Sequence, residues 1–188
     1  FEIGPSDDGK SGLQFVNEIK GNSIPKEFFA AIEKGFRGSM SNGILAGFPM
    51  DSVKVRLIDG SFHPVDSDDL SFETAARIGF KEAGANAGSV LMEPIMKVEV
   101  HVPSDYLGDV TGDLNRRRAV LHNVEMEHGL QVVKADAPLA EMFGYITTLR
   151  SLTQGRGTFN MELSHYEVVP PALADVVIKK AKGIYFFF

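Results

Sequence analysis

The sequence predicts an α+β fold in two domains, residues 1–93 and residues 94–188, with the ferredoxin-like order βαββαβ in the second. Three observations predict it. Two segments of the second half echo each other at a constant offset, so that Leu107 matches Met142. Each segment has apolar residues at helical spacing and then the alternation of a strand. The strand pattern itself restarts at Pro94, which marks the expected domain boundary.

The first domain is expected to be an α/β module. Alternation predicts a strand over residues 13–19 and another over residues 53–58. Between them a helix is predicted after Pro25, with Ser23 available as its N-cap. The buried stripe of this helix is expected to comprise Phe28, Phe29, Ile32 and Phe36.

A second helix is predicted after the turn at Asp59-Gly60, with Ser67 or Asp68 as its cap. Its apolar side is expected to comprise Leu70, Phe72, Ala75, Ala76, Ile78, Gly79, Phe80 and Ala83. At the start of the chain, Phe1-Glu2-Ile3 is typical of the end of an interrupted strand. The chain is therefore expected to be a fragment of a longer protein.

The second domain is expected to run strand, helix, strand, strand, helix, strand, beginning with the strand at residues 95–102. A hairpin turn is predicted at Glu127-His128-Gly129. A last amphipathic helix is predicted over residues 172–182, with its lysines late, where they suit the helix dipole. The aromatic tail at residues 184–188 matches no predicted element.

Composition excludes several classes of protein. The 188 residues contain no cysteine, which excludes a disulfide scaffold, a zinc–thiolate site and a thiol nucleophile. No apolar run reaches the roughly 20 residues that a membrane span needs, and no signal peptide is recognisable. The net charge of −6 argues against non-specific coating of nucleic acid. Any nucleic-acid contact is expected to be local and specific for shape.

One motif has the letters of a phosphate-binding loop. Gly4 to Ser11 fits G-x-x-x-x-G-K-S, the pattern that a nucleotide-binding enzyme would use. Such a loop needs a helix directly after it, to cradle phosphates on the helix N-terminus. The residues that follow alternate as a strand, and Asp7-Asp8 would repel phosphates. A turn between two strands is the better interpretation.

His63 differs from the other histidines, which fit surface or hairpin positions. It lies in the loop from Gly60 to Asp66, between a strand and the start of a helix. A loop tip with His, Ser and Asp is a poor core but a reasonable contact surface. An ordinary capped turn explains the same residues equally well, so both interpretations stay open at this point.

Arginines follow both echoing helices. Arg116, Arg117 and Arg118 form the strongest basic cluster, and Arg150 and Arg156 are its counterparts in the second copy. Arginine at a helix end also satisfies carbonyls and the dipole. We favour phosphate contact, because guanidinium groups bind phosphate in a bidentate manner. Both clusters are expected to face one polyanionic partner.

Several long motifs resemble the elongation factor G family of ribosomal translocases. They are GDVTGDLNRRR (108–118) and EMFGYITTLRSLTQGRGTF (141–159), preceded by FVNEIKGNSIPKEFFAAIEKGF (15–36), NGILAGFPM (42–50), VRLIDGSFHPVDS (55–67) and LMEPIMKVEV (91–100). The motifs cover nearly the whole chain in the family's order. The resemblance implies that residues 1–93 are most of domain four, with a ribosomal-protein-like α/β fold, and that residues 94–188 are domain five.

For domain four, the resemblance implies a tip that enters the small-subunit decoding site and supports movement of tRNA and mRNA. His63 stands where the family has its functional tip histidine, and Ser61, Phe62 and Asp66 are its expected neighbours in the contact. The family's first tip loop would precede Phe1. Pro64 after the histidine, Leu152 in place of a usual glutamine and the short hairpin around His128 depart from the family pattern. A divergent paralogue, or an organellar or lineage-specific copy, is therefore expected.

For domain five, the resemblance implies contact with large-subunit rRNA and proteins through Arg116, Arg117, Arg118, Arg150 and Arg156. GTP and Mg would belong to a domain outside this chain, so the fragment is expected to need no cofactor or metal, to have no catalytic residues and to hydrolyse nothing. A monomer without a membrane partner is implied, in the cytoplasm or an organellar matrix. The alternative is a related ribosome-associated factor for recycling or for tetracycline protection.

Overall fold

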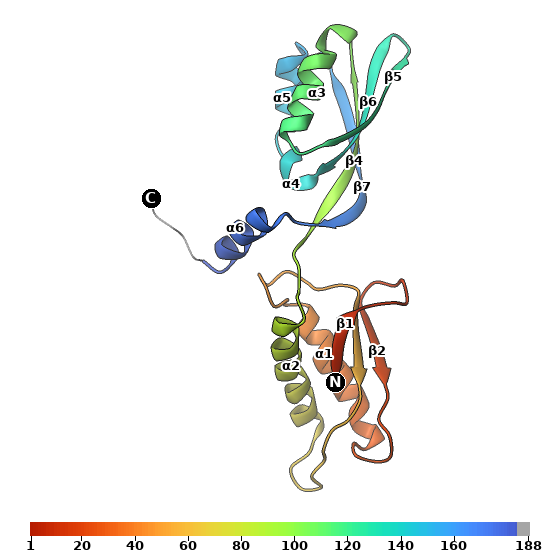
Figure 1. Ribbon diagram of the computed structural model, residues 1–188, viewed down its shortest axis with the longest axis vertical. Coiled ribbons are helices and arrows are strands. Elements are labelled where there is room, and N and C mark those ends of the chain that lie inside the picture. The colour runs from red at the N-terminus through yellow and green to blue at the C-terminus, as the bar shows by residue number, and fades with distance from the viewer. Residues whose placement is uncertain (184–188) are drawn as a thin grey trace. The chain divides into compact units, whose positions relative to one another are not determined.

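The computed structural model of the chain describes residues 1–183 (Figure 1). It divides into two compact units, one formed by Phe1–Val90 with the segment from Pro171 and the other by Leu91–Pro170. The division lies close to the limit expected at residue 94. The segment from Pro171 is grouped with the first unit, whereas the sequence assigns it to the second domain. The limits 1–93 and 94–188 of two independent domains stay a prediction. The aromatic tail at residues 184–188 lies outside the described residues.

The first unit is a three-stranded sheet with two long helices packed together. Its elements are β1 (Glu2–Pro5), β2 (Leu13–Asn17), the 3₁₀ turn η1 (Lys26–Phe28), α1 (Phe29–Met40), β3 (Val53–Leu57) and α2 (Asp69–Asn86). The strand order is β1-β3-β2, with β3 antiparallel to β1 and parallel to β2. Parallel pairing requires a crossover connection, which α1 supplies. The sequence prediction of these helices and strands is confirmed, including the strand end at the start of the chain, which belongs to β1.

The core of this unit combines aliphatic side chains with phenylalanines, and it confirms the stripe predicted for α1. Phe28 and Phe36 are buried, and Phe36 lies within 6.2 Å of the Phe80 ring of α2 between centroids. The prediction for α2 was too broad, because Leu70 and Ile78 are 70% and 61% exposed. An 18-residue helix packed on one side buries only a stripe, here Ala76, Phe80 and Gly84.

Helix capping was predicted correctly for one helix and wrongly for the other. Asp68 caps α2 by accepting a hydrogen bond from the Ser71 backbone N–H, 2.7 Å away. The hydroxyl of Ser71 also donates to this carboxylate, and together these bonds hold the pKa of Asp68 below its usual value. Ser23 caps nothing: the helical segment begins after Pro25, and the Ser23 hydroxyl is buried without a hydrogen-bond partner among the described residues.

The second unit has the predicted ferredoxin-like order. Its elements are β4 (Met92–Val102), η2 (Ser104–Tyr106), α3 (Leu107–Arg116), β5 (Val120–Glu127), β6 (Leu130–Pro138), α4 (Leu139–Met142), α5 (Tyr145–Leu152) and β7 (Thr158–Val168). The strand order is β5-β6-β4-β7, antiparallel throughout. The two-residue hairpin turn is confirmed: His128 and Gly129 both have positive φ, 50° and 83°. The last helix, α6 (Pro171–Ala181), is also confirmed.

One difference lies in the second echo, where the sequence predicts a single helix. The structure splits it into α4 and α5, because Phe143 is extended and Gly144 adopts a left-handed conformation with φ 73°. Glycine reaches that region without steric cost. Phe143 is 75% exposed as a result.

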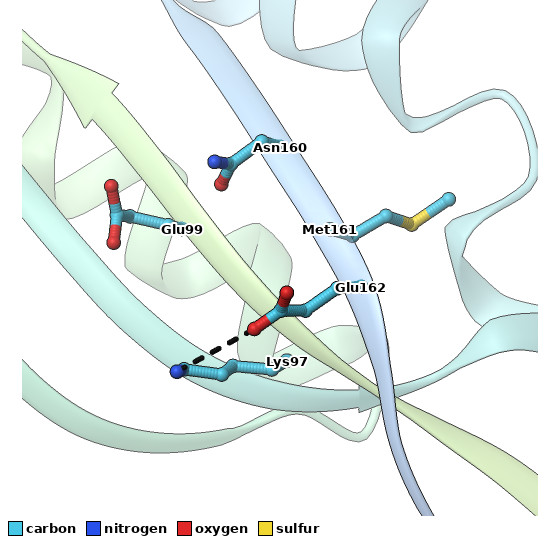
Figure 2. A pocket seen from close by; sticks show the side chains of 5 residues that line it. All are labelled: Lys97, Glu99, Asn160, Met161 and Glu162. Carbon is cyan, nitrogen blue, oxygen red and sulfur yellow. Dashed lines mark ion pairs between the residues drawn. The ribbon is translucent and has the colours of Figure 1, made fainter.

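The sheet of the second unit has one polar face. Cross-strand register places Lys97 beside Asp136 and Glu162, and Glu99 beside Lys134 and Asn160. A shallow hollow on this face is lined by Lys97, Glu99, Asn160, Met161 and Glu162, and Figure 2 shows Lys97 paired with Glu162 across it, 3.6 Å apart. Charged and amide side chains occupy these registers, and His101 follows on the same face, 2.8 Å from Glu99.

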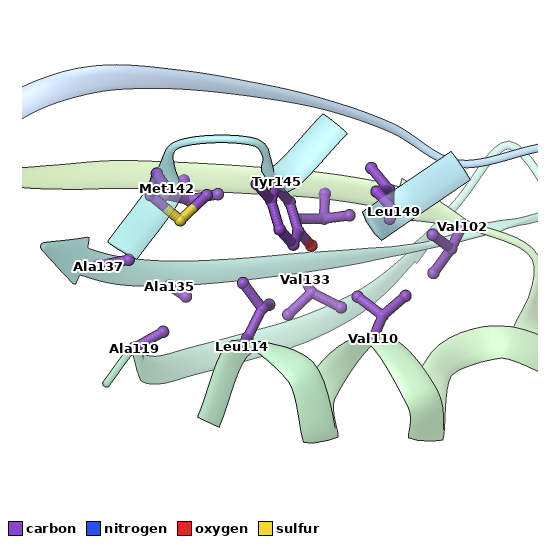
Figure 3. Packing of buried hydrophobic residues seen from close by; sticks show 12 residues of the cluster. Val102, Val110, Leu114, Ala119, Val133, Ala135, Ala137, Met142, Tyr145 and Leu149 are labelled. Carbon is purple, nitrogen blue, oxygen red and sulfur yellow. The ribbon is translucent and has the colours of Figure 1, made fainter. Parts of the chain in front are cut away.

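The opposite face of that sheet carries the core (Figure 3). Valines of β4 and β6 meet Val110 and Leu114 of α3 and Leu149 of α5, all of them fully buried. Leu114 and Leu149, which occupy matching positions in the two echoing segments, therefore both pack into this core. In Figure 3 the helices run in opposite directions, so that Leu114, late in α3, lies near Tyr145, the first residue of α5.

Candidate functional site

The loop from β3 to α2 closes on itself around His63. The backbone N–H of His63 donates to the Ser67 hydroxyl at 2.9 Å. In return, the His63 carbonyl accepts hydrogen bonds from the backbone N–H groups of Asp66, at 3.2 Å, and Ser67, at 3.0 Å. Tight turns of this kind satisfy backbone groups internally. The side chains at the apex are thereby left free to face outward.

The four residues predicted for contact in this loop differ in how exposed they are. Ser61, His63 and Asp66 are exposed, as a contact surface requires. Phe62 is half-buried and lies against the core, with its ring centroid 5.9 Å from that of Phe28. Sequence reasoning missed Val65, which is 92% exposed. The signal was available, because a valine next to proline in a Gly/Ser/Asp turn has nothing to pack against.

The sequence of this loop and of its flanking residues is acidic. Asp59, Asp66, Asp68 and Asp69 lie in or beside it, and no lysine or arginine occurs from Leu57 to Ala76. Phosphate groups would be repelled there. A contact made by this loop must therefore use shape, apolar surface and neutral hydrogen bonds.

Arg117, predicted as an RNA contact, lies inside the fold of the second unit. Its Nε donates to Asp113 at 2.8 Å, and other guanidinium nitrogens donate to the Glu141 carbonyl and, at 3.1 Å, to the Thr148 hydroxyl. The guanidinium also lies over the Tyr145 ring, 5.1 Å from its centroid. With its side chain 18% exposed, Arg117 joins α3 to α4 and α5.

Arg118 is also paired within the second unit. It makes a bidentate ion pair with Glu93, and Glu141 lies 3.8 Å away. The hydrogen bonds to Glu93 raise the pKa of Arg118 above its usual value. Its backbone has φ 62°, the left-handed conformation that ends α3.

Among the five arginines predicted to contact rRNA, the exposed ones are Arg116, Arg150 and Arg156. Arg116 makes one bond, to the Gly112 carbonyl at 3.3 Å, while Arg156 lies over the Tyr106 ring at 5.0 Å. Because α3 and α5 are antiparallel, Arg116 ends one helix at one end of the layer and Arg150 ends the other at the opposite end. The 10 residues of α3 correspond to about 15 Å. The echo places arginines at equivalent positions but does not bring them together into one patch.

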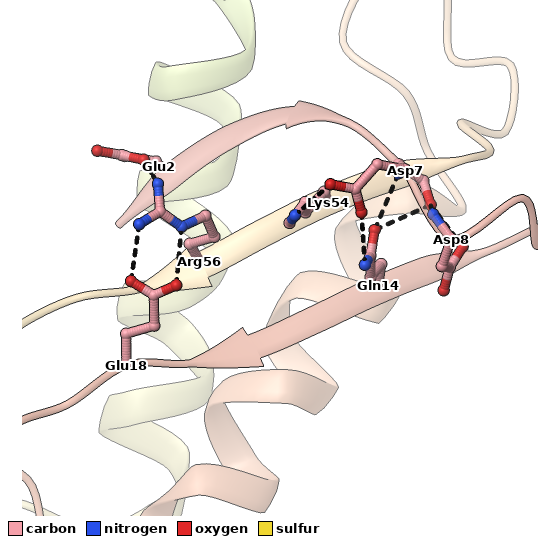
Figure 4. A network of polar contacts seen from close by, with 8 residues as sticks. Glu2, Asp7, Asp8, Gln14, Glu18, Lys54 and Arg56 are labelled. Atoms are coloured by element: carbon pink, nitrogen blue, oxygen red, sulfur yellow. Dashed lines mark hydrogen bonds and ion pairs between the residues drawn. The ribbon is translucent and has the colours of Figure 1, made fainter.

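The outer face of the first unit's sheet is a network of ion pairs (Figure 4). Arg56 binds Glu18 in a bidentate manner, at 2.7 and 3.0 Å, and also pairs with Glu2, while Lys54 pairs with Asp7 at 2.6 Å. Arg56 holds the pKa of Glu18 below its usual value, and Lys54 with Gln14 does the same for the pKa of Asp7. These pairs link all three strands.

The motif that resembles a phosphate-binding loop belongs to this network. It forms the turn from β1 to β2, and a strand follows it from Leu13. Asp8 accepts from the backbone N–H of Lys10 at 2.9 Å, inside the turn. The interpretation as a turn between strands is confirmed, since no helix N-terminus follows to hold phosphates.

Three of the other histidines, His101, His122 and His165, each lie beside a single carboxylate. His101 lies 2.8 Å from Glu99, and His122 lies 2.8 Å from Asp136. Among residues 1–183, no group of three or more His, Asp or Glu side chains could hold a metal ion. In the same described part, no helix is both long and apolar enough to cross a membrane.

Comparisons with known proteins match both units. Residues 1–88 match the family model "Elongation factor G, domain IV", and residues 90–177 match "Elongation factor G C-terminus". Two curated relatives named elongation factor G, from Amoebophilus asiaticus and Cytophaga hutchinsonii, are each 57% identical over 183 residues. These matches cover 97% of this chain and 26% of each relative.

A solved structure of a Thermus thermophilus protein is also similar. Its TM-score is 0.84 at 39% identity, over 96% of this chain and 27% of that chain. The chain thus spans about a quarter of the length of the relatives that it matches. The two family models lie on it in order, and they meet at residues 88–90, next to the division between the two compact units. The chain belongs to the elongation factor G family.

Proposed function

We propose that this chain forms the ribosome-contacting end of a translation factor that promotes translocation of tRNA and mRNA. The observation that carries the proposal is the closed, outward-facing loop at His63, in a unit that matches the family's domain IV. In this proposal the loop enters the small-subunit decoding site, with His63, Ser61 and Asp66 at its surface. Because its proposed partner is the ribosome, the protein is proposed to act in the cytoplasm or an organellar matrix.

The second unit serves as the large-subunit anchor in the same proposal. Arg116, Arg150 and Arg156 are the exposed cations that can reach rRNA phosphates. Arg117 and Arg118 support them by holding the fold. GTP and Mg would be bound by a part of the protein outside these residues, and that part would carry out hydrolysis. The factor is proposed to act as a monomer.

The test is a chimaera in which these 188 residues replace the matching stretch of the Cytophaga hutchinsonii elongation factor G. We expect the chimaera to translocate, and His63→Ala to slow translocation while ribosome-stimulated GTP hydrolysis stays near that of the parent. Equal translocation by the parent chimaera and His63→Ala would refute the role of the loop. A chimaera that splits ribosomes or releases tetracycline but does not translocate would instead support a recycling or protection factor.

A further inference from the structure

We infer that Val65 is itself a contact residue of the loop at His63, and that Phe62 and Ser67 are positioning residues that hold it outward. The inference rests on the proposed function, since it concerns what the same loop touches. It changes the role expected for Phe62 from a contact to an anchor. It also adds Val65, a residue that the resemblance did not identify.

The exposure of Val65 is the first observation. Its side chain is 92% exposed, the highest value among the exposed large apolar side chains of the described residues. Single exposed apolar residues are common and need no explanation by themselves. The case for Val65 therefore depends on the frame that holds it.

That frame ties both ends of the apex together. Ser67 accepts the backbone N–H of His63 through its hydroxyl and donates its own N–H to the His63 carbonyl, at 2.9 and 3.0 Å. The next residue, Asp68, caps α2, so the loop runs directly into a rigid helix start. At the other end, Gly60 lies so close to Ile24 that an added Cβ would be 2.4 Å from the Ile24 Cδ1.

Phe62 fixes the direction of the apex. Its ring lies 5.9 Å from Phe28, and Phe28 stacks on Phe72 of α2 at 4.6 Å between centroids. Three rings from η1, the loop and α2 thus form one aromatic cluster. With Phe62 turned into the core, His63 and Val65 lie on the solvent side of the turn, where both are exposed.

The chemistry of the apex selects one kind of partner surface. Pro64 and Val65 are apolar, and the charged residues of the segment from Leu57 to Ala76 are all acidic. Repulsion disfavours phosphates there. Among the groups of RNA, ribose and base atoms are then left as partners for the apex, because they offer apolar area and neutral hydrogen-bonding groups. The loop therefore acts through shape complementarity with one position on the RNA, and it adds little to the overall affinity for the ribosome.

The experiment uses the chimaera described above, with single-turnover translocation and salt-dependent ribosome binding as separate readouts. We expect Val65→Asn, which removes the apolar surface without adding a charge, to slow translocation about tenfold, a loss of roughly 1.4 kcal/mol of transition-state stabilisation. Val65→Ala should slow it less. Neither substitution should change binding or its salt dependence. Leu70→Ala is the matched control, because Leu70 is 70% exposed on α2 outside the loop.

Ser67 is tested by removing and restoring its hydroxyl. Ser67→Ala should slow translocation, and Ser67→Thr, which keeps the hydroxyl acceptor, should recover the parent rate. Thermal unfolding of both variants checks that the unit stays folded. Phe62→Leu should behave like Ser67→Ala, because it keeps apolar burial but loses the ring contact with Phe28.

The outcomes separate this inference from the proposed function. Slow translocation by His63→Ala with parent rates for the Val65 and Ser67 variants overturns the inference and leaves the proposed function standing. If every variant, His63→Ala included, translocates at the parent rate, both the inference and the proposed function are overturned. A loss of ribosome binding by Val65→Asn that parallels its loss of translocation also contradicts the inference, because the contact would then supply affinity.

Discussion

The guanidinium of Arg117 lies over the ring of Tyr145, 5.1 Å from its centroid, and thereby joins the C-terminal end of α3 to the first residue of α5. Arg117 reaches Asp113 at the same time, and that carboxylate belongs to a residue that is only 9% exposed. The basic cluster that predicts RNA binding from sequence thus contains a residue on which the helical layer depends.

We expect Arg117→Ala to lower the free energy of unfolding by about 2–4 kcal/mol, because it leaves the nearly buried Asp113 without its cation. Arg116→Ala is the control, and it should change this free energy by less than about 0.5 kcal/mol, since Arg116 is exposed. Urea unfolding of the two variants measures both values. Equal losses would show that Arg117 has no special structural role.

The close packing of α1 on α2 gives a second prediction. A Cβ at Gly35 would lie 2.5 Å from the Glu73 carbonyl oxygen and 2.8 Å from the Ala76 Cβ, so the helices would have to separate. We expect Gly35→Ala to destabilise the first unit by about 1–3 kcal/mol. Gly112→Ala in α3 meets open space and should stabilise the second unit by about 0.5–1 kcal/mol. Thermal unfolding compares the two, and the same sign for both would contradict the packing argument.

Packing of this kind explains what the sequence could predict and what it could not. Periodicity predicts the strands and helices of both units, because alternation and the helical stripe reflect one buried face. It cannot tell which face of α2 is covered, so Ile78 was wrongly assigned to the core. It also cannot see the antiparallel relation of the two echoing helices, which separates Arg116 from Arg150.

The candidate site shows the same limit. The sequence identified the loop at His63, because its Gly, Ser and Asp residues are typical of an exposed turn. Assigning Phe62 to the core and Val65 to the surface required the three-dimensional contacts with Phe28. Tertiary partners likewise decide that Arg117 is internal while Arg116 is exposed, although the two are neighbours in sequence.

Tyr145 gives a prediction about alkaline pH. Burial, and next the charge of Asp113, raises the pKa of its hydroxyl well above the usual 10.0, and the hydroxyl has no hydrogen-bond partner among the described residues. The unfolded chain therefore loses this proton at a lower pH than the folded chain. The stability that the protonated hydroxyl supports is complete below about pH 10 and falls as the pH rises above it.

Tyr145→Phe removes both the ionisable group and the unpaired hydroxyl. We expect it to leave stability at neutral pH unchanged or to raise it by about 1 kcal/mol, and to weaken the loss of stability above about pH 10. Denaturant unfolding at neutral pH and at several alkaline values measures this difference. A steeper alkaline loss in the variant than in the parent would contradict the prediction.

The exposed arginines give the last prediction, which concerns where the second unit meets RNA. Arg116 lies at one end of the helical layer, and Arg150 and Arg156 lie at the other. Each arginine that binds a phosphate releases counterions, so its loss should weaken ribosome binding and reduce the slope of log affinity against log salt by roughly 0.7–0.9.

We expect the double variant Arg150→Ala, Arg156→Ala and the single variant Arg116→Ala to weaken co-sedimentation of the chimaera with ribosomes. Lys97→Ala on the polar sheet face is the control, because Lys97 already pairs with Glu162 and lies on the face of the sheet opposite the helical layer. If only one end of the layer changes the salt slope, that end alone is the RNA contact. If Lys97→Ala weakens binding as much as the arginine variants do, the contact lies on the sheet face, and the assignment of the helical layer to RNA is wrong.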